Sequence, residues 1–271
     1  MAAETAHRER ASVHIVVLVK AVPIVGNERL LDGQRVDRGS GLEANGNDEY
    51  VLETALKLTE THGGDVTLLT MGPAGAAEAL RKGLAMGAAR AVHVIDDAFG
   101  GSCARATAEV LAAALRTLTF DLVFAGADTS DGQGGTLAAS IATRLDLPYL
   151  SYAGHVEPTA DGAGVRIHRL SAVGHDVLEA PMPALVMGTQ VLGEPRYPSL
   201  RGIMGARSKE IVTRSLADLG IDPSRVGADA ATTRVLGVSP PPPRAGATVL
   251  RTDPDAAVAA TIDFLAARGL V

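Results

Sequence analysis

Residues 121–148 read DLVFAGADTSDGQGGTLAASIATRLDLP, and this stretch decides the fold. Its first five residues predict a buried strand, and the residues from Thr136 onward predict an amphipathic helix. Between them, Gly132, Gly134 and Gly135 let the backbone approach a ligand, because no Cβ stands in the way. A helix N-terminus adds unpaired N–H donors and the positive end of the dipole. The stretch therefore predicts a nucleotide phosphate site, although the same pattern also suits a tight turn without ligand.

The same alternation of strand and helix precedes this stretch. Strands are predicted at 13–19, 65–70 and 91–95, and helices at 49–61, 74–86 and 103 to about 118. Short links between alternating elements predict an α/β domain of three layers, in which helices cover both faces of a parallel sheet. Ligands bind at the carboxyl ends of such strands. We therefore expect the loops after Val19, Thr70 and Ala125 to converge.

The pattern changes after Pro148. Residues 165–170 and 176–180 predict an antiparallel hairpin, and residues 184–187 predict another buried strand. Four prolines at 240–243 then form a stiff spacer before a capped helix at 253–269. We expect a disordered tail at 1–12, an α/β domain at 13–222 and an arm at 223–271 that packs on another chain.

Composition excludes several classes of protein. Among 271 residues, 46% are hydrophobic but only 3% are aromatic, so the core must consist of Ala, Val, Leu and Ile. The net charge of -6 argues against nucleic acid as a main partner. No apolar run approaches the ~20 residues of a membrane span, and the first ten residues lack a signal-peptide core. These features predict a cytoplasmic protein.

The chain offers no obvious catalytic or metal site. Cys103 is the single cysteine, which excludes an internal disulfide and a Cys-based metal cluster. The seven histidines are scattered without metal-ligand spacing. No Ser/His/Asp set and no paired acids suggest hydrolysis. We therefore expect no catalytic residues and no metal.

Several motifs occur in an order that points to one family. They are VVLVKAVP (16–23), NDEYVLETALKL (47–58), RKGLAMGA (81–88), the Gly-rich loop and EPRYPSLRGIM (194–204). Together they resemble the β subunit of electron-transfer flavoprotein, the small subunit of FixA type, over roughly Val13–Asp222. The order of RKGLAMGA and EPRYPSLRGIM is specific, whereas a Gly-rich loop alone would not be.

The resemblance implies a fold similar to adenine nucleotide α-hydrolases and an electron carrier that is not itself an enzyme. It implies a heterodimer in which the α subunit holds most of a redox-active FAD and the β subunit buries a structural AMP. Such a pair accepts electrons from flavin dehydrogenases, such as the acyl-CoA dehydrogenases of fatty acid oxidation. It passes them to a membrane quinone oxidoreductase.

The resemblance also assigns residues. The implied AMP contacts are Leu18, Asn45, Gly46, Asn47, Asp48, Met71, Gly126, Ala127, Asp128, Thr129, Ser130, Asp131, Gly132, Gln133, Gly134, Gly135, Thr136 and Leu137. The implied docking residues are Pro198, Leu200, Ile203 and Met204, within a recognition loop at 193–210, with Leu200 as the anchor. Three features depart from the family. The Gly-rich loop reads Ser130 to Thr136 without the paired acids that the family often carries near the helix start, the basic run after the recognition loop is reduced to Arg207 and Lys209, and a glutamate near the flavin is replaced by Leu170.

Simpler interpretations stay open for several of these residues. Asn45 to Asp48 suit a helix cap, although the Asn45 amide could also bind an adenine edge or a backbone group. Met71 could fill the core, and the docking residues could belong to the core of a short helix. Asp131 is expected to bind a ribose hydroxyl or to point to solvent. Cys103 lies at a helix start that would stabilise a thiolate, but a buried, inert thiol is the expectation.

Two other functions stay open. In a bifurcating flavoprotein a second FAD would replace AMP and the complex would use NADH. In a universal-stress-type nucleotide sensor there would be no redox role, but the hairpin, the recognition loop and the terminal helix would then be surplus.

Overall fold

The structure is a computed structural model that describes residues 12–24, 26, 29–31, 35–39, 41–239, 242–243 and 246–271. Most of the predicted N-terminal tail and half of the proline run, Pro240 and Pro241, lie outside these residues. The chain divides into two compact units, one ending at Leu236 and one spanning Gly237–Val271. The predicted packing of the arm on a partner stays a prediction.

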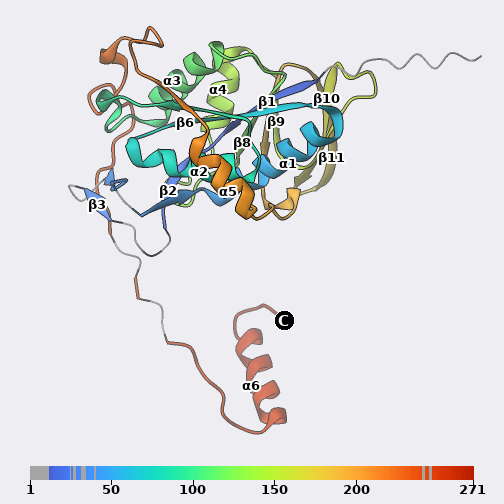
Figure 1. The fold of residues 1–271 in the computed structure, drawn as a ribbon. Coiled ribbons are helices and arrows are strands. Elements are labelled where there is room, and N and C mark those ends of the chain that lie inside the picture. The colour runs from blue at the N-terminus through green and yellow to red at the C-terminus, as the bar shows by residue number, and fades with distance from the viewer. Residues whose placement is uncertain are drawn as a thin grey trace, which may run out of the picture. The chain divides into compact units, whose positions relative to one another are not determined.

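Among the described residues, a nine-stranded sheet forms the centre of the first unit, in the order β11-β10-β9-β12-β8-β1-β6-β7-β13 (Figure 1). Its strands are β1 (Val13–Leu18), β6 (Gly64–Met71), β7 (Arg90–Val94), β8 (Leu122–Gly126), β9 (Tyr149–Pro158), β10 (Gly164–Ser171), β11 (Gly174–Pro181), β12 (Ala184–Gly188) and β13 (Ile211–Arg214). In the order β9-β12-β8-β1-β6-β7-β13, every neighbouring pair is parallel. The two remaining pairs, β9 with β10 and β10 with β11, are antiparallel. The predicted parallel α/β sheet with a hairpin extension is confirmed.

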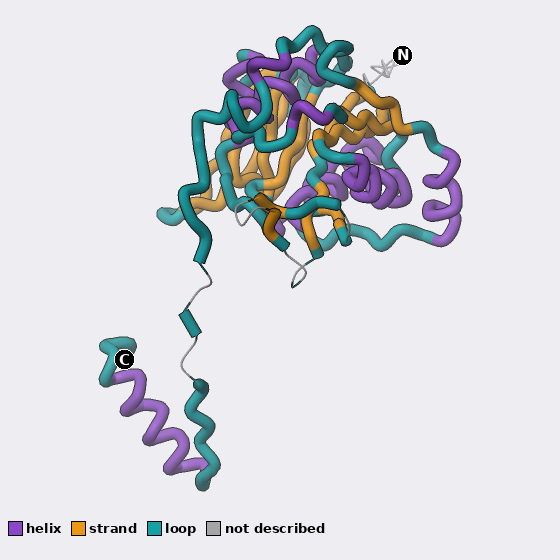
Figure 2. The backbone as a smooth tube through the Cα atoms, turned by 90° about the vertical axis from the view of Figure 1, so that its left-hand side faces the viewer, coloured by secondary structure: helices purple, strands orange, loops and turns teal. Residues whose placement is uncertain are grey.

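Helices cover both faces of this sheet (Figure 2). One layer contains α1 (Gly46–His62), α2 (Ala77–Met86) and α5 (Leu200–Ser208), and the other contains α3 (Ala104–Arg116) and α4 (Leu137–Leu145). In β1, Ile15 and Val17 pack with the first layer, and Val16 and Leu18 with the second. Burial on both faces explains why this strand is continuously apolar.

Small residues bring the layers close together, as the low aromatic content requires. A Cβ on Gly83 of α2 would lie 2.6 Å from Leu68 Cδ1 in β6 and 3.1 Å from Leu52 Cδ2 in α1. Alanines of α3 and α4, including Ala108 and Ala142, pack in the second layer. The core therefore depends on close backbone approach rather than on large rings.

The structure contains elements that the sequence pattern did not predict. They include β9 and β13, 3₁₀ turns such as Ala74–Ala76, the pair β2 (Ala21–Pro23) with β5 (Leu42–Ala44), and the pair β3 (Leu30–Leu31) with β4 (Arg35–Val36). A bulge hides β9 from a period-two pattern, because Tyr152 adopts a φ of 56° and the pairing register shifts there. The remaining pairs are too short to leave a signal.

Several helix starts differ from the prediction by one to three residues; α2, for example, begins at Ala77 instead of residue 74. Helix α1 begins at Gly46, three residues before the expected start. Cys103, where the helix was expected to begin, is the N-cap of α3, and the Ser102 hydroxyl before it accepts a hydrogen bond from Gly227 N at 2.8 Å. Ser102 thus ties the segment after β13 to the sheet domain.

The second unit contains α6 (Pro254–Ala266), which confirms the predicted terminal helix. Asp253 caps it by accepting from Ala256 N at 3.0 Å, and Pro254 begins it. Val258, Ile262 and Phe264 are exposed in this helix. No helix in the described part of the chain combines the length and apolar character that crossing a bilayer requires.

Candidate functional site

The loops after β1 and β8 meet at the carboxyl edge of the sheet. Lys20 follows β1 and extends to the Gly-rich loop, where its Nζ donates to Thr129 Oγ1 at 3.2 Å and to Asp131 Oδ1 at 2.8 Å. Thr129 also shapes the loop, since its carbonyl accepts from Gln133 N at 3.0 Å. The predicted convergence of these two loops is therefore confirmed.

Asp131 is held inside this edge. Its side chain is 1% exposed, and its two oxygens pair with Lys20 Nζ and with Arg38 Nη2. Burial works to raise the pKa of Asp131, but the hydrogen bond and charge of Lys20, the Thr129 hydroxyl and the Arg38 charge hold it at about 2. The expectation that Asp131 points to solvent is wrong, because two cations from other loops draw it inward.

Arg38 brings the loop after β6 into the same assembly. Residues 35–39 and 41–44 lie close to that loop: a Cβ on Gly75 would lie 3.5 Å from Arg38 O and 3.2 Å from Leu42 Cδ1. Met71 itself is partly buried and packs against the α3 side of the core. The third loop therefore approaches the Gly-rich loop through this segment, while the Met71 side chain serves the core.

The start of α1 binds the backbone of the Gly-rich loop. Asn45 is buried; its Nδ2 donates to Asp128 O at 2.9 Å, and its Oδ1 accepts from Ser130 N at 3.2 Å. Asn47 Nδ2 donates to Asp128 Oδ1 at 2.8 Å. Asn45 makes no side-chain cap. The amide was predicted to bind either an adenine edge or a backbone group, and in the structure it binds the backbone.

Asp48 of α1 binds the backbone of the loop after β1. It is buried, and its Oδ2 accepts from Lys20 N at 2.8 Å, so it does not act as the predicted helix cap. Burial raises the pKa of Asp48 to about 7, against the lowering effects of the Lys20 and Gly126 N–H groups, the Asn45 amide and the Lys20 charge. A Cβ on Gly126 would lie 2.3 Å from Asp48 Oδ1, so only glycine fits there.

Beyond Asp131 the loop turns its backbone outward. Gly132, Gly134 and Gly135 are exposed, and a Cβ on Gly134 or Gly135 would meet nothing within 4 Å. Among the described residues, the N–H groups of residues 134–139 have no protein acceptor; the first bond of α4 runs from Ser140 N to Thr136 O at 3.0 Å. Thr136 provides no side-chain cap. This is a row of free donors at the positive end of a helix.

The other predicted contacts take supporting places. Leu18 is buried at the end of β1, Gly46 begins α1, and Leu137 begins α4 and packs on the core. Ala127 N donates to Gly188 O at 3.0 Å, which joins the loop to β12. Gln133 adopts a φ of 44°, which turns the chain into the glycines. These residues set the course of the loop and its links to the sheet.

The sequence analysis did not assign two cationic residues of this edge to the site. They are Lys20 and Arg38. A lysine directly after a fully apolar strand is the signal that could have found Lys20, because that position lies at the ligand edge of a parallel sheet. Arg38 lies in a polar stretch without periodicity, so no sequence signal distinguished it.

The predicted docking residues lie on or beside α5. Ser199 caps this helix by accepting from Gly202 N at 3.0 Å. Leu200 is 74% exposed, Met204 is 65% exposed and Ile203 is 43% exposed, whereas Ala206 is buried. The alternative that the three apolar residues belong to the core is therefore wrong. A short helix does form, but it points them outward at a spacing of three or four residues.

Cys103 is partly buried at the N-cap of α3. Burial opposes ionisation, but hydrogen bonds from Ala106 N, the Thr232 hydroxyl and other backbone N–H groups lower the pKa of the thiol to about 6. The thiol is thus partly exposed and not fully buried as expected, and its inertness stays a prediction.

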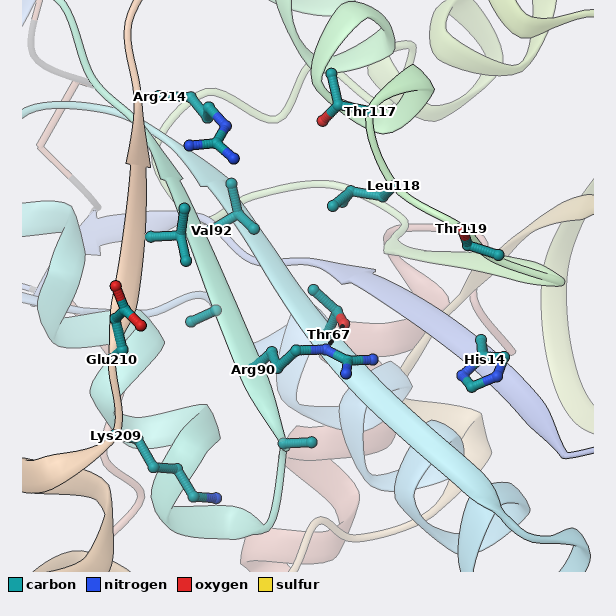
Figure 3. A pocket seen from close by; sticks show the side chains of 13 residues that line it. His14, Thr67, Arg90, Val92, Thr117, Leu118, Thr119, Lys209, Glu210 and Arg214 are labelled. Atoms are coloured by element: carbon teal, nitrogen blue, oxygen red, sulfur yellow. Dashed lines mark hydrogen bonds between the residues drawn. The ribbon is translucent and has the colours of Figure 1, made fainter. Parts of the chain in front are cut away.

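A cavity of about 500 Å³ lies elsewhere, at the amino ends of the strands (Figure 3). Thr67, Val92 and Leu118 line it, with His14 and Arg90 at strand starts. This places it at the opposite edge of the sheet from the Gly-rich loop. Within the described ranges no group of three or more His, Cys, Asp or Glu side chains is arranged to hold a metal ion.

Comparison with known proteins agrees with this geometry. The family model described as "Electron transfer flavoprotein domain" matches residues 34–219. The electron transfer flavoprotein subunit beta of Mycobacterium tuberculosis is 39% identical over 238 residues, covering 84% of this chain and 89% of the relative. That of Thermoanaerobacterium thermosaccharolyticum is 34% identical, covering 84% and 88%.

A third relative bears a different name. The caffeyl-CoA reductase-Etf complex subunit CarD of Acetobacterium woodii is 35% identical over 239 residues, covering 86% of this chain and 90% of the relative. The match to the family model spans more than half of the chain, and the relatives are covered almost fully. The chain therefore belongs to the electron transfer flavoprotein family, among its beta subunits.

Proposed function

We propose that this chain is the β subunit of a heterodimeric electron carrier that binds AMP at the Gly-rich loop as a structural ligand. In this proposal it supports the FAD of an α subunit and docks through α5 onto flavin dehydrogenases such as acyl-CoA dehydrogenases. The complex then delivers electrons to the respiratory chain through a membrane quinone oxidoreductase. Membership of the family makes it an electron carrier component rather than a catalytic enzyme.

The observation that carries the AMP site is the set of unpaired N–H groups at residues 134–139, beside two glycines with open space above them. Amides in this arrangement bind phosphate oxygens, and the helix dipole favours their charge. A carboxylate would repel a phosphate, but Asp131 is neutralised by Lys20 and Arg38. The residues present therefore fit the phosphate of a nucleoside monophosphate.

Lys20 can contribute a further donor. Its ammonium carries three N–H groups, of which Thr129 and Asp131 take two. Its side chain is 37% exposed, and its Nζ would lie 3.7 Å from a Cβ on Gly132. The cation thus lies next to the glycines, where it can face a phosphate while still holding the loop.

The partner's FAD supplies the redox chemistry of the complex. The role of this chain is physical: it binds the α subunit, orients the docking helix and, when AMP is bound, ties together the loops after β1, β6 and β8. A ligand that binds only the folded state also stabilises that state by mass action.

The experiment is to express this chain with its α subunit, purify the complex and identify the nucleotides released on denaturation. We expect one AMP and one FAD for each heterodimer. Two FAD and no AMP would replace the proposal with the bifurcating alternative, which the similarity to a subunit of a caffeyl-CoA reductase complex keeps in view. An adenine nucleotide without flavin or partner would indicate the sensor.

The variant Gly134→Val tests the site itself. Its side chain would enter open space, so the protein without nucleotide should fold as before. The same side chain would block close approach of a phosphate to the backbone, so we expect AMP content to fall well below one equivalent. Full occupancy in this variant would show that the loop only makes a turn.

A further inference from the structure

Arg196 lies in the segment that precedes α5, and its side chain links this segment to α1. Its Nε donates to Glu53 Oε2 at 2.7 Å, and its Nη2 donates to Glu53 Oε1 at 3.2 Å. The same guanidinium donates to Glu60 through Nη1 at 2.5 Å and Nη2 at 2.9 Å. Its backbone N–H adds a bond to Glu53 Oε2 at 3.1 Å. One side chain thus spans two turns of α1.

Glu53 needs this partner. It is 4% exposed within α1, and an unpaired carboxylate there would carry a large desolvation penalty. The fork of a guanidinium satisfies both of its oxygens, which a single ammonium cannot do in the same way. Lys57, at 3.4 Å from Glu53, is largely exposed and adds little. The segment before α5 is therefore fixed to α1 by Arg196.

The other end of α5 is fixed to α2. Arg81 Nη1 donates to Ala206 O at 2.7 Å and to Lys209 O at 2.5 Å. Lys209 Nζ in turn donates to Ala88 O at 2.6 Å, beyond the end of α2. A Cβ on Gly202 would lie 2.3 Å from Ala85 O, so the two helices touch through backbone. Both ends of α5 are thus fixed, while Leu200, Ile203 and Met204 stay exposed.

We propose that Arg196 is a positioning residue for dehydrogenase docking: its fork onto Glu53 and Glu60 holds the docking segment, residues 193–208, in its binding conformation before a partner arrives. This inference rests on the proposed docking role of α5. A short apolar helix without such support would have to be ordered during binding, which costs affinity. The bonds to Glu53 and Glu60 remove that cost in advance.

The test uses Arg196→Lys in the complete complex with its α subunit and FAD. The electron acceptor role is assayed with the acyl-CoA dehydrogenase that the wild-type complex oxidises fastest, and the complex is the varied substrate. Ordering the segment on contact should raise KM about tenfold and change kcat less than twofold. Hydrogen exchange of the α5 amides should accelerate, while AMP and FAD content stay unchanged.

Matched variants separate positioning from general damage. Arg166→Lys breaks a similar cluster, in which Arg166 of β10 contacts Glu157 on β9 and Glu179 on β11, and should leave KM unchanged. Glu60→Gln keeps the buried Glu53 pair and removes only the exposed half of the fork. It should raise KM about threefold, and it serves as the test variant if Arg196→Lys fails to fold.

The outcomes distinguish the positioning role of Arg196 from the docking role of α5. If Leu200→Ala raises KM but Arg196→Lys and Glu60→Gln do not, Arg196 does not position the segment and the inference is overturned. Unchanged amide exchange in Arg196→Lys would overturn it as well. If Leu200→Ala also leaves KM unchanged, the docking assignment of α5 fails, and the inference fails with it.

Discussion

The Gly-rich edge, which is the Gly-rich loop with Lys20 and Arg38, and the docking segment both combine ion pairs on the inner side with an open outer face, but the outer faces differ in chemistry. At the edge, Asp131 is buried between two cations, and the loop leaves free N–H groups facing outward. At the docking segment, Arg196 binds two carboxylates, and α5 leaves apolar side chains facing outward. In each region charge-assisted bonds lie on the inner side, and the outer side is left open.

The difference between the outer faces indicates which kind of ligand or partner each surface binds. Free backbone donors at a helix N-terminus favour an anion that is enclosed by loops. Exposed leucine, isoleucine and methionine favour an apolar pocket on another protein. Both regions have a rigid framework. A substitution that weakens the framework should therefore lower stability, whereas a substitution that alters only the open face should change the binding of AMP or of the dehydrogenase.

The largest expected effect comes from breaking the framework of the Gly-rich edge. A side chain in Gly126→Val would collide with Asp48 Oδ1 and with Asn47 Cβ, which lies 2.8 Å from the added Cβ. We expect a loss of about 4 kcal/mol in stability, measured as a fall in the thermal unfolding midpoint of the complex after AMP has been removed from every protein compared. Gly134→Val is the control, since it enters open space, and an equal fall in both variants would contradict this view of the loop.

The second effect is a pH dependence caused by Asp48. Its folded pKa of about 7 lies above its ordinary value of 3.8, so folding takes up a proton. The resulting stability is complete below pH 4 and is lost as the pH rises to about 7. Asp48→Asn should remove this loss, so the variant gains on wild type by on the order of 3 kcal/mol between pH 4 and 8.

Thermal unfolding of both proteins across this pH range, with AMP removed, measures the effect. A constant difference between them from pH 4 to 8 would show that Asp48 stays ionised in the folded protein. The Lys20 and Gly126 N–H groups would then outweigh its burial.

Asp131 should give a smaller effect of opposite sign. Its folded pKa of about 2 lies below 3.8, so its ionised form contributes stability above pH 4 that disappears as the pH falls toward 2. Asp131→Asn should cost about 2 kcal/mol at pH 7 and nothing near pH 2. Unfolding measured against pH tests this, and a cost that persists at pH 2 would assign the effect to lost packing instead.

The sequence predicted the parts of the fold that follow from regular patterns. Apolar runs and short links were enough for the parallel sheet, and the hairpin at 165–180 followed from alternation around Gly174. Strand β9 was missed because Tyr152 interrupts its alternation. Strand β13 was missed because four residues carry too little pattern.

The site was predictable where backbone chemistry decides it and not where long side chains do. Glycines and a helix start are visible in the sequence, so the Gly-rich loop was found. The partners of Asp131 are 111 and 93 residues away, and no local rule connects Asp131 to Lys20 or Arg38. The link of Arg196 to Glu53, 143 residues apart, was hidden for the same reason.

The most direct test of the two-region account is to measure AMP content and KM for the dehydrogenase in the same two complexes, Gly134→Val and Leu200→Ala. We predict that Gly134→Val loses AMP and keeps its KM, while Leu200→Ala keeps AMP and raises KM. Val173→Ala, at another exposed apolar residue, should change neither. If either variant changed both quantities, or if their effects were exchanged, the separation of nucleotide edge and docking segment would be contradicted.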